Sequence, residues 1–400
     1  MSRKSPQLRF EGFTDDWEER KLGDFIKISR EQEVKKVDLH EEKIGYYVLA
    51  MRTFDFEGYI DYSKPYWINN FESADDDLFL NRKEFAIIDA DMDASLPKIG
   101  KVLLNATNNK FLLAAHIRKI KVDVQVDSIF AYALMRTTEL VERLKLEANG
   151  SISKRLLDKN VYKQKVYLPI HLEEQQQIGE FFWTLEKTIA LHQHKLDLLK
   201  EQKKGYLQKM FPKNGAKVPE LRFAGFADDW EERKLGEISK TTIGEFVIKT
   251  KQSDESPYPV YNGGRSYTGK YDEYNNDGPK IVISARGANA GFVNYVSGRY
   301  WAGNSCYSVS VTKEDEFSIG YLYQFIKYNQ VLFTAYQQAA NIPSVSKSDV
   351  EKFSIKYPTV LEQKKIESFF KQLDNTIALH QRKLDLLKEQ KKGYLQKMFV

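Results

Sequence analysis

Two long segments of the chain carry apolar residues at alternating steps of three and four positions, with Lys, Glu, Gln and Asp between them. This heptad spacing is typical of an amphipathic helix that packs on a second helix and exposes its charged side to water. We therefore predict a central long helix in 169–211 and a C-terminal long helix in 358–400. The expected core positions of this helix pair are Phe182, Leu185, Ile189, Leu196, Leu199, Phe370, Leu373, Ile377, Leu384 and Leu387.

The regions outside these helices alternate short apolar runs with Gly, Asn, Asp and Ser. Such runs favour β-strands, and a longer helical stretch follows the strands in each region. The expected fold class is therefore α/β (α+β), with strands and helices mixed in both regions. The predicted strands include 46–50, 85–89, 101–105 and 116–122 in the first region and 258–261, 280–284 and 306–311 in the second, and the predicted helices are 129–147 and 320–337.

Each half of the chain begins and ends with a repeated segment, and the stretches between these segments differ. Residues 6–25 and 219–238 share fifteen of twenty residues, and residues 188–211 and 376–399 differ only at one position, His194 against Arg382. The same pieces in the same order favour a pseudo-two-fold symmetric chain, in which the two long helices would run antiparallel. Because the stretches between them show little likeness, we expect the repeated ends to do one task twice and the middles to serve two targets.

The predicted domain organisation follows from this repeat. Trp17 and Trp230, in the repeated short segments, are expected to fold back on the ends of the long helices. Those segments either brace the domain joints or dock the same partner twice, and the sequence leaves both interpretations open. The expected parts are an N-terminal segment (1–25), a first divergent domain (26–168), the central helix (169–211), a linker with the second repeated segment (212–238), a second divergent domain (239–357) and the C-terminal helix (358–400).

Composition narrows the class of protein. The net charge of +5 and pI of about 8.8 fit nucleic-acid binding without demonstrating it. A single cysteine, Cys306, excludes an internal disulfide and a zinc site built from several cysteines. No apolar stretch approaches the ~18 residues of a membrane span, and the N-terminus has no secretory pattern, so we expect a cytoplasmic protein without a membrane segment.

Polar side chains that suit base edges and phosphates follow several predicted strands. Arginine pairs with guanine, and asparagine or glutamine with adenine, in the major groove, while lysine neutralises phosphates. The residues that we expect to contact DNA are Arg52, Thr53, Lys98, Lys154, Asn262, Arg265, Ser266, Tyr267, Arg286, Asn289, Gln338, Asn341 and Lys347.

The sequence contains segments that resemble catalytic or ligand-binding motifs, but each of them is incomplete. The segment from Gly264 to Lys270 resembles a phosphate-binding loop, but Tyr271 stands where Ser or Thr must hold magnesium. Asp89, Asp91 and Asp93 begin like a calcium loop, which then lacks its required glycine and glutamate. The simplest nuclease and amino-methyltransferase motifs are also missing, so we predict no catalytic residues and no metal site.

The arrangement of motifs resembles the specificity subunits of type I restriction–modification systems over essentially the whole chain. The resemblance is carried by Asp-Trp-Glu-x-x-Lys-Leu-Gly at 16–23 and 229–236, by Glu-Gln after a proline at 174–175 and 362–363, and by the Lys-Leu-Asp-Leu-Leu-Lys-Glu-Gln-Lys-Lys-Gly helices. It implies two target-recognition domains, each recognising one half of a split, asymmetric DNA site, and a helix pair that sets the spacer between the halves.

The same resemblance implies partners and cofactors. Two methyltransferase subunits would dock on the fixed regions, and restriction–translocation subunits would join them on double-stranded DNA. S-adenosylmethionine, ATP and magnesium would belong to those subunits, and this chain would bind no cofactor and would not itself be an enzyme. The alternatives are a coiled-coil protein-interaction scaffold without DNA specificity and a nuclease or methyltransferase with degenerate motifs.

Overall fold

The protein forms two compact units. Unit 1 comprises residues 1–197 and 379–400, and unit 2 comprises residues 198–378. Unit 1 is thus built from two separate stretches of chain, whereas unit 2 is continuous. The computed structural model describes the whole chain except residues 1–4, 31–38, 63–64, 70, 72, 74, 94, 151–152, 214 and 336–342.

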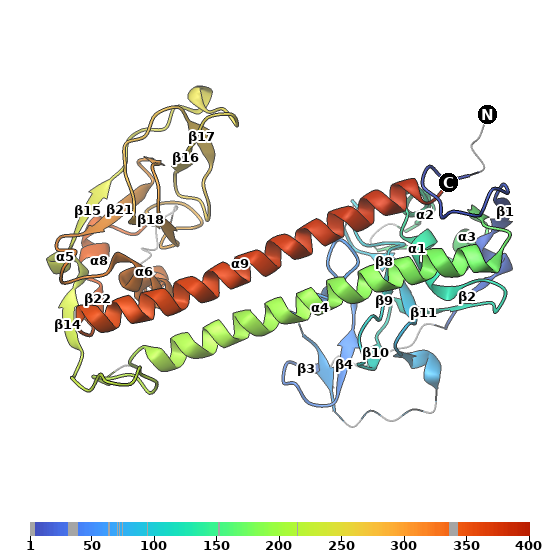
Figure 1. Cartoon of the computed structure of the whole chain (residues 1–400), viewed down its shortest axis with the longest axis horizontal. Helices are drawn as coiled ribbons and strands as arrows, with labels where there is room; N and C mark the ends of the chain where they lie inside the picture. The colour runs from blue at the N-terminus through green and yellow to red at the C-terminus, as the bar shows by residue number, and fades with distance from the viewer. Residues whose placement is uncertain are drawn as a thin grey trace. The chain divides into compact units, whose positions relative to one another are not determined.

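Two long helices, α4 (Leu172–Met210) and α9 (Val360–Lys397), contribute to both units (Figure 1). In unit 1 the ring centroids of Phe181 and Tyr394 lie 4.8 Å apart, and in unit 2 those of Tyr206 and Phe369 lie 4.9 Å apart. In each unit an early residue of one helix meets a late residue of the other. The helices therefore run antiparallel within each unit, as the repeat predicted.

The heptad stripe faces the interior of both units. Phe182 and Phe370, which are equivalent in the repeat, are fully buried. His192 and His380 also occupy stripe positions, and their Nδ1 atoms lie 3.3 Å apart in unit 1. Of the ten predicted core residues, six are buried (Phe182, Ile189, Leu196, Leu199, Phe370 and Leu384) and four are half-buried (Leu185, Leu373, Ile377 and Leu387).

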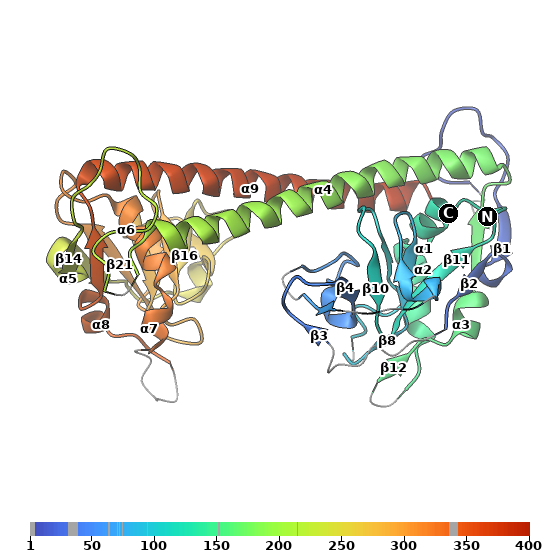
Figure 2. The same cartoon turned by 90° about the horizontal axis from the view of Figure 1, so that it is seen from below.

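The first divergent domain, in unit 1, lies on one side of the helices and contains two main sheets (Figure 2). One has the strand order β2 (Ile26–Ile28), β11 (Ile117–Val122), β7 (Phe85–Ile88), β9 (Val102–Leu104), and the other has the order β3 (Leu39–His40), β5 (Trp67–Ile68), β4 (Tyr46–Leu49), β10 (Phe111–Leu113), β6 (Phe79–Leu80). Two small sheets pair β1 (Glu18–Lys21) with β13 (Lys165–Leu168) and β8 (Ala90–Asp91) with β12 (Lys154–Arg155), and the helices are α1 (Ser128–Met135), α2 (Thr138–Leu146) and α3 (Asp158–Tyr162).

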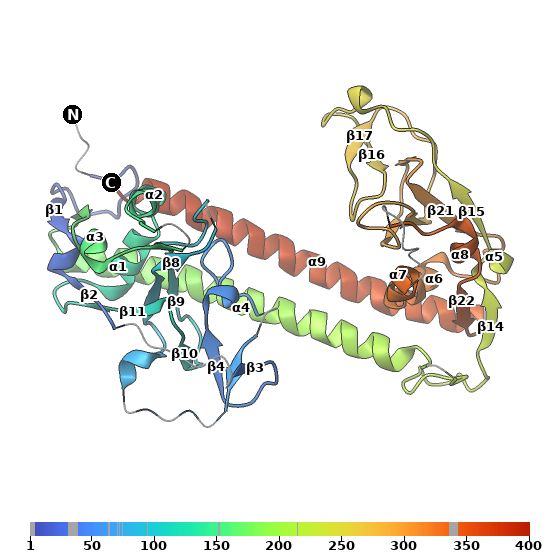
Figure 3. The same cartoon turned by 180° about the vertical axis from the view of Figure 1, so that it is seen from behind.

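The second divergent domain, in unit 2, also contains two main sheets (Figure 3). One has the order β15 (Ser239–Ile243), β21 (Cys306–Val311), β18 (Lys280–Ser284), β19 (Val293–Val296), and the other has the order β17 (Gly269–Tyr271), β16 (Tyr258–Tyr261), β20 (Trp301–Ala302). A small sheet pairs β14 (Glu231–Lys234) with β22 (Ser354–Tyr357), and the helices are α5 (Leu235–Ile238), α6 (Ile319–Tyr328), α7 (Val331–Ala335) and α8 (Lys347–Glu351).

Despite their unlike sequences, the two divergent domains share the order of their four-stranded sheets and of three strands in their second sheets. The four-stranded sheets match strand for strand, β2-β11-β7-β9 against β15-β21-β18-β19, and both are antiparallel throughout. In the second sheets the parallel pair of β10 with β4 has its counterpart in that of β20 with β16. The duplication therefore extends through the middles of the chain as well as its ends.

The predicted helices that follow the strands are each broken in two. The expected helix at 129–147 is α1 and α2, separated at Arg136 and Thr137, and the expected helix at 320–337 begins as α6 and α7. Arg136 ends α1 and donates to the carbonyl of Val102 at 3.1 Å, while Lys327 near the end of α6 donates to that of Val293 at 2.8 Å. These equivalent contacts fasten each helix to the edge strand of its sheet.

Candidate nucleic-acid interface

Six of the predicted DNA-contacting residues of unit 2 lie on two loops: Asn262, Arg265, Ser266, Tyr267, Arg286 and Asn289. The loop after β16 carries Arg265, whose Nε donates to Oδ1 of Asn289 at 3.2 Å on the loop after β18. Ser284 Oγ, at the end of β18, donates to the carbonyl of Gly264 at 2.9 Å. Arg286 pairs by a backbone bridge with Ser344, so a third segment adjoins these loops. The structure therefore brings together segments that lie up to 80 residues apart in the sequence.

The members of this loop cluster differ in what their side chains can reach. Arg265, Ser266, Tyr267 and Arg286 are exposed, and Tyr267 has 52% of its surface accessible. Asn262 instead accepts from the backbone N–H of Ser305 at 3.1 Å, so its oxygen helps to hold the loop. Lys347, on α8, is exposed and pairs with Glu351 at 3.5 Å. Gln338 and Asn341 lie outside the described residues.

The corresponding loops of unit 1 follow β4 and β7. Arg52 is half-buried, with 38% of its side chain exposed, and its guanidinium lies 4.1 Å from the ring centroid of Tyr66. Its amino group also lies 3.6 Å from a carboxylate oxygen of Glu41. Lys154 is half-buried on β12, which pairs with β8 at Asp91. Both units thus present arginine on the loop that follows the same strand of the same sheet.

Two predicted DNA contacts of unit 1 need correction. Thr53 is fully buried, and its hydroxyl donates to the carbonyl and accepts from the amide of Ala50, both at 2.9 Å, which leaves no exposed atom for DNA. Lys98 is half-buried and donates to the backbone carbonyls of Met51 and Phe54. These two side chains therefore hold the loop that carries Arg52 in place.

The acidic run near Lys98 is explained by local structure. Asp91 is buried, and its carboxylate accepts from the backbone N–H of Asp93 at 3.1 Å and of Lys98 at 2.8 Å. Asp89 is buried beside His116 and Arg118, at 3.2 and 3.4 Å. Within the described part of the chain, no group of three or more His, Cys, Asp and Glu side chains could hold a metal ion.

The Glu-Gln pairs at the starts of the long helices fasten each divergent domain to its helices. Arg9 binds buried Glu174 through two bonds of 2.6 and 2.8 Å, and Arg222 binds buried Glu362 through two bonds of 2.8 Å. The carboxylate hydrogen bond raises the pKa of both arginines further. The adjacent glutamines, Gln175 and Gln363, accept from the backbone N–H groups of Asp127 and Ser318. Asp127 and Ser318 are the N-caps of α1 and α6. The same two glutamines donate to the carbonyls of Pro169 and Pro358.

The repeated short segments pack on the ends of the long helices, which supports the interpretation that they brace the joints between domain and helix. Trp17 and Trp230 are buried, and their ring centroids lie 6.1 Å from Phe399 and 6.5 Å from Phe211, at the ends of the two long helices. The backbone N–H of Leu8 donates to the carbonyl of Lys397 at 2.8 Å, and that of Leu221 donates to Lys209 at the same distance. Both tryptophans therefore fold back on the ends of the long helices, as the sequence predicted.

The long helices also keep an exposed apolar side. Leu191 and Leu198 on α4 and Leu379 and Leu386 on α9 are exposed. They repeat every seven residues, so each pair lies on one side of its helix. In unit 1 a groove of about 480 Å³ lies beside α4 and is lined by Phe10, Gln177, Glu180, Phe181, Thr184, Leu185, Thr188 and Leu387.

Two domains with a common sheet framework, each with its own loops and each fastened to the long helices, define a scaffold that is built twice and carries different loops each time. The sequence matches the family of the type I restriction modification DNA specificity domain over residues 14–201 and 227–389. The chain belongs to this family, and it is a specificity subunit of a type I restriction–modification system. The matched segments include both divergent domains.

Known relatives span most of the chain. It is 23% identical to the putative type I restriction enzyme MjaX specificity subunit of Methanocaldococcus jannaschii, over 94% of this chain and 91% of that protein. It is 19% identical to the putative type I specificity subunit S.MgeORF438P of Mycoplasma genitalium, over 69% of this chain and 72% of that protein. The crystal structure of the type I restriction–modification S subunit from M. genitalium has a TM-score of 0.74 at 16% identity, covering 99% of both chains, which confirms the fold. No helix among the described residues is both long and apolar enough to cross a membrane.

Proposed function

We propose that each divergent domain recognises one half of a split DNA site and that the helix pair fixes the spacer between the halves. The observation that carries this proposal is the repeated topology: the scaffold is the same twice, whereas the loops after β4 and β7 differ from those after β16 and β18. Arg52 serves the first half-site, and Arg265 and Arg286 serve the second, through base edges and phosphates.

The partners follow from the repeated surfaces. A leucine pair of the same spacing stands on each long helix, Leu191 with Leu198 and Leu379 with Leu386, and an identical surface presented twice suits two copies of one partner. In this proposal the partner is a methyltransferase subunit that uses S-adenosylmethionine. Restriction–translocation subunits, with ATP and magnesium, complete the complex and supply its cleavage chemistry, while this chain contributes recognition alone.

Reconstitution tests this function directly. The chain is combined with its methyltransferase subunit, S-adenosylmethionine and DNA, and the methylated bases are located by sequencing. We expect methylated adenines in a single split sequence that has a spacer of constant length. A complex that assembles but methylates DNA without sequence preference, or does not methylate it at all, would contradict the proposal and favour a protein-interaction scaffold.

The loop arginines should each affect one half of the site. Arg265→Ala or Arg286→Ala is expected to relax the second half-site by about 1–3 kcal/mol per lost base contact, roughly 5- to 150-fold in discrimination. Arg52→Ala should relax the first half-site instead, so each variant is the control for the other. Methylation rates on oligonucleotides with single base-pair changes give the measurement, and equal relaxation of both halves would argue that these arginines bind phosphates only.

The length of the helices should set the spacer. Because α4 and α9 pair antiparallel in each unit, seven residues must be inserted in both, after Ala190 and after Ala378, to keep the heptad stripe in phase. Seven residues add ~10.5 Å of helix, which corresponds to about 3 base pairs at ~3.4 Å each. We expect sequencing of methylated sites to show both half-sites unchanged and a longer spacer. An unchanged spacer would mean that the helices do not act as the ruler.

A further inference from the structure

A hairpin at residues 54–61 distinguishes the first divergent domain from the second. It is closed by a backbone bridge between Phe54 and Ile60, and it lies between β4 and β5. Residues 50–66 connect these strands in unit 1, whereas only residues 262–268 connect the equivalent strands β16 and β17 in unit 2. The hairpin is therefore an addition to the common topology.

The hairpin continues directly from the loop that carries Arg52. The backbone N–H of Asp61 donates to the carbonyl of Thr53 at 2.7 Å, which ties the end of the hairpin to that loop. At the turn, the carboxylate of Asp55 accepts from the backbone N–H groups of Glu57 and Tyr59, both at 2.8 Å. A displacement of the hairpin would therefore also move the segment that carries Arg52.

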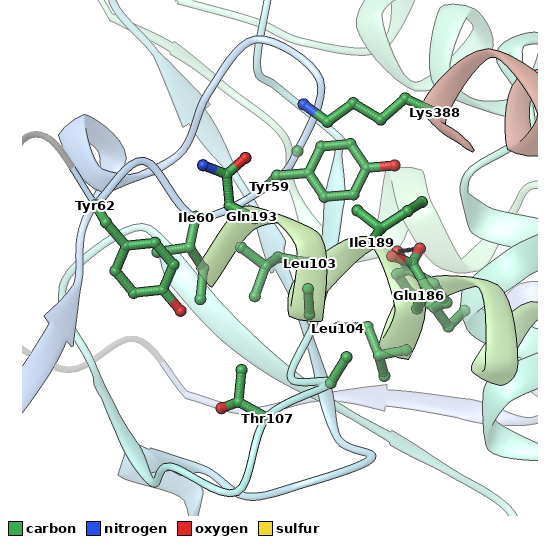
Figure 4. A pocket seen from close by; sticks show the side chains of 14 residues that line it. Tyr59, Ile60, Tyr62, Leu103, Leu104, Thr107, Glu186, Ile189, Gln193 and Lys388 are labelled. Atoms are coloured by element: carbon green, nitrogen blue, oxygen red, sulfur yellow. Dashed lines mark hydrogen bonds between the residues drawn. The ribbon is translucent and has the colours of Figure 1, made fainter. Parts of the chain in front are cut away.

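The acidic side of the hairpin lies against α9. Lys388 Nζ lies 2.9 Å from a carboxylate oxygen of Glu57 and 3.7 Å from one of Asp55. It also lies 4.4 Å from the ring centroid of Tyr59, and Figure 4 shows these two side chains next to each other. Only 18% of the Lys388 side chain is exposed. Burial tends to raise the pKa of Glu57, but the hydrogen bond and charge of Lys388 outweigh it and lower that pKa. This neutralisation matters for a DNA-binding domain, because unpaired carboxylates would repel phosphates.

A second lysine of α9, Lys391, also binds the hairpin. Lys391 is buried, and its Nζ donates to the hydroxyls of Tyr59 and Tyr132, both at 3.2 Å, and to the carboxylate of Glu186. Arg136 donates to the carbonyl of Gly58 at 3.1 Å. Gly58 has a positive φ of +84°, and a Cβ there would lie 2.3 Å from the Arg136 guanidinium, so this turn requires glycine.

A cavity of about 50 Å³ under the hairpin completes the joint (Figure 4). It is lined by Tyr59 and Tyr62 from the hairpin side and by Ile189, Ala190 and Gln193 from α4. Within unit 1 the hairpin side therefore contacts α9 and faces α4 across this cavity.

Within the described part of unit 2, the counterparts of these lysines repeat only the ion pair between the two long helices. Lys200 and Lys203 are the counterparts of Lys388 and Lys391 in an almost identical helix. Lys200 is exposed, and Lys203 pairs at 2.6 Å with Asp374 of α9. The shorter connection at 262–268 offers no hairpin of this kind. The repeat therefore provides a natural control for any test of Lys388.

We propose that Lys388 and Lys391 are positioning residues for recognition of the first half-site, because they set the place of the 54–61 hairpin and, through it, of the Arg52 loop. Lys200 and Lys203 have no such role for the second half-site. This inference rests on the proposed division of the DNA site between the two domains. Specificity for the first half-site would then depend on two lysines of α9 whose counterparts on α4 do not have this role.

The test compares Lys388→Ala with Lys200→Ala in the complex with the methyltransferase subunit. Methylation rates are measured on the cognate DNA and on DNAs with one changed base pair in either half. We expect Lys388→Ala to lower discrimination at the first half-site about threefold to tenfold and to leave the second within about twofold. Lys200→Ala should leave both within about twofold. Lys388→Arg, which keeps the charge, should restore most of the loss.

Further variants distinguish positioning from folding. Glu57→Gln changes the hairpin and not the helix, and it should lower discrimination at the same half-site. Tyr59→Phe removes only the hydroxyl that accepts from Lys391, and it should act in the same direction. The charge-swapped pair Lys388→Glu with Glu57→Lys should recover specificity. If Lys388→Ala changes both halves equally, matches Lys200→Ala, or changes neither half, the inference is wrong. A wild-type complex without sequence-specific methylation would instead contradict the proposed function.

Discussion

Replacing residues 239–355 with the corresponding segment of another specificity subunit is expected to change one half of the methylated DNA sequence and to leave the other half and the spacer unchanged. The reason is that these residues contain both sheets of the second divergent domain and all of its described loop residues, whereas unit 1 and the long helices stay intact. Activity on the original sequence should fall by about 10³-fold or more, because several base pairs of one half-site become mismatched at ~1–3 kcal/mol each.

The grafted segment must keep two contacts with the long helices. Gln363 accepts from the backbone N–H of Ser318 at 2.9 Å, and Ser318 caps α6. Tyr321 packs on Phe211, with ring centroids 5.9 Å apart. A donor segment that retains a capping residue and an aromatic at these places should seat correctly on the helices. The reciprocal replacement of residues 26–165 is the control, and it should change only the other half. If either replacement altered both halves, the two domains would not recognise DNA independently.

Below pH 7, Glu186→Gln is expected to destabilise unit 1 by about 3–5 kcal/mol, because it leaves the buried positive charge of Lys391 without its partner. The side chains of Glu186 and Lys391 are 5% and 2% exposed. Burial and the nearby Arg136 lower the pKa of Lys391 to about 7, while the charges of Lys391 and Arg136 overcome burial and keep the pKa of Glu186 low. Removing the carboxylate should lower the midpoint of thermal unfolding by about 6–20 °C, at ~2–4 °C per kcal/mol.

The repeat again supplies the control for this variant. Asp374 is the counterpart of Glu186, but it is 36% exposed and its partner Lys203 is 19% exposed, so Asp374→Asn should cost about 1 kcal/mol or less. The pH dependence gives an independent check. Glu186→Gln lowers the folded-state pKa of Lys391 below 7, so its effect should be largest below pH 7 and should shrink as the pH rises above 7, where Lys391 is neutral in both folded proteins. Equal losses for the two variants at pH 6 would contradict this assignment.

The periodic and repeated features of this protein could be predicted from the sequence, because a heptad stripe and a verbatim repeat are local patterns. Phe182, Ile189, Phe370 and Leu384 are buried as expected. The positions of Arg265 and Asn289 on loops after strands were also predictable, whereas the hydrogen bond between them is visible only in the fold. Their contact with DNA stays a prediction.

Other features depended on packing across long sequence separations. Thr53 looked like a loop residue that could bind DNA, yet it caps its own turn. The common topology of the two middles was missed because a fold is specified by the places of buried residues, which unlike sequences can share. The hairpin at 54–61 was missed because its partner, Lys388, stands more than 300 residues away in a helix whose other copy binds no such element.

The split composition of unit 1 has a consequence for biosynthesis. Its core includes Leu395, Met398 and Phe399, which pack with Trp17, Phe130 and Phe182. These residues are translated only after all of unit 2, so the core of unit 1 cannot be completed until the end of α9 has been synthesised. Unit 2 is continuous and can close earlier. Until α9 arrives, unit 1 must expose the apolar surface that α9 later covers, and it is therefore the part of the nascent chain most in need of protection from aggregation.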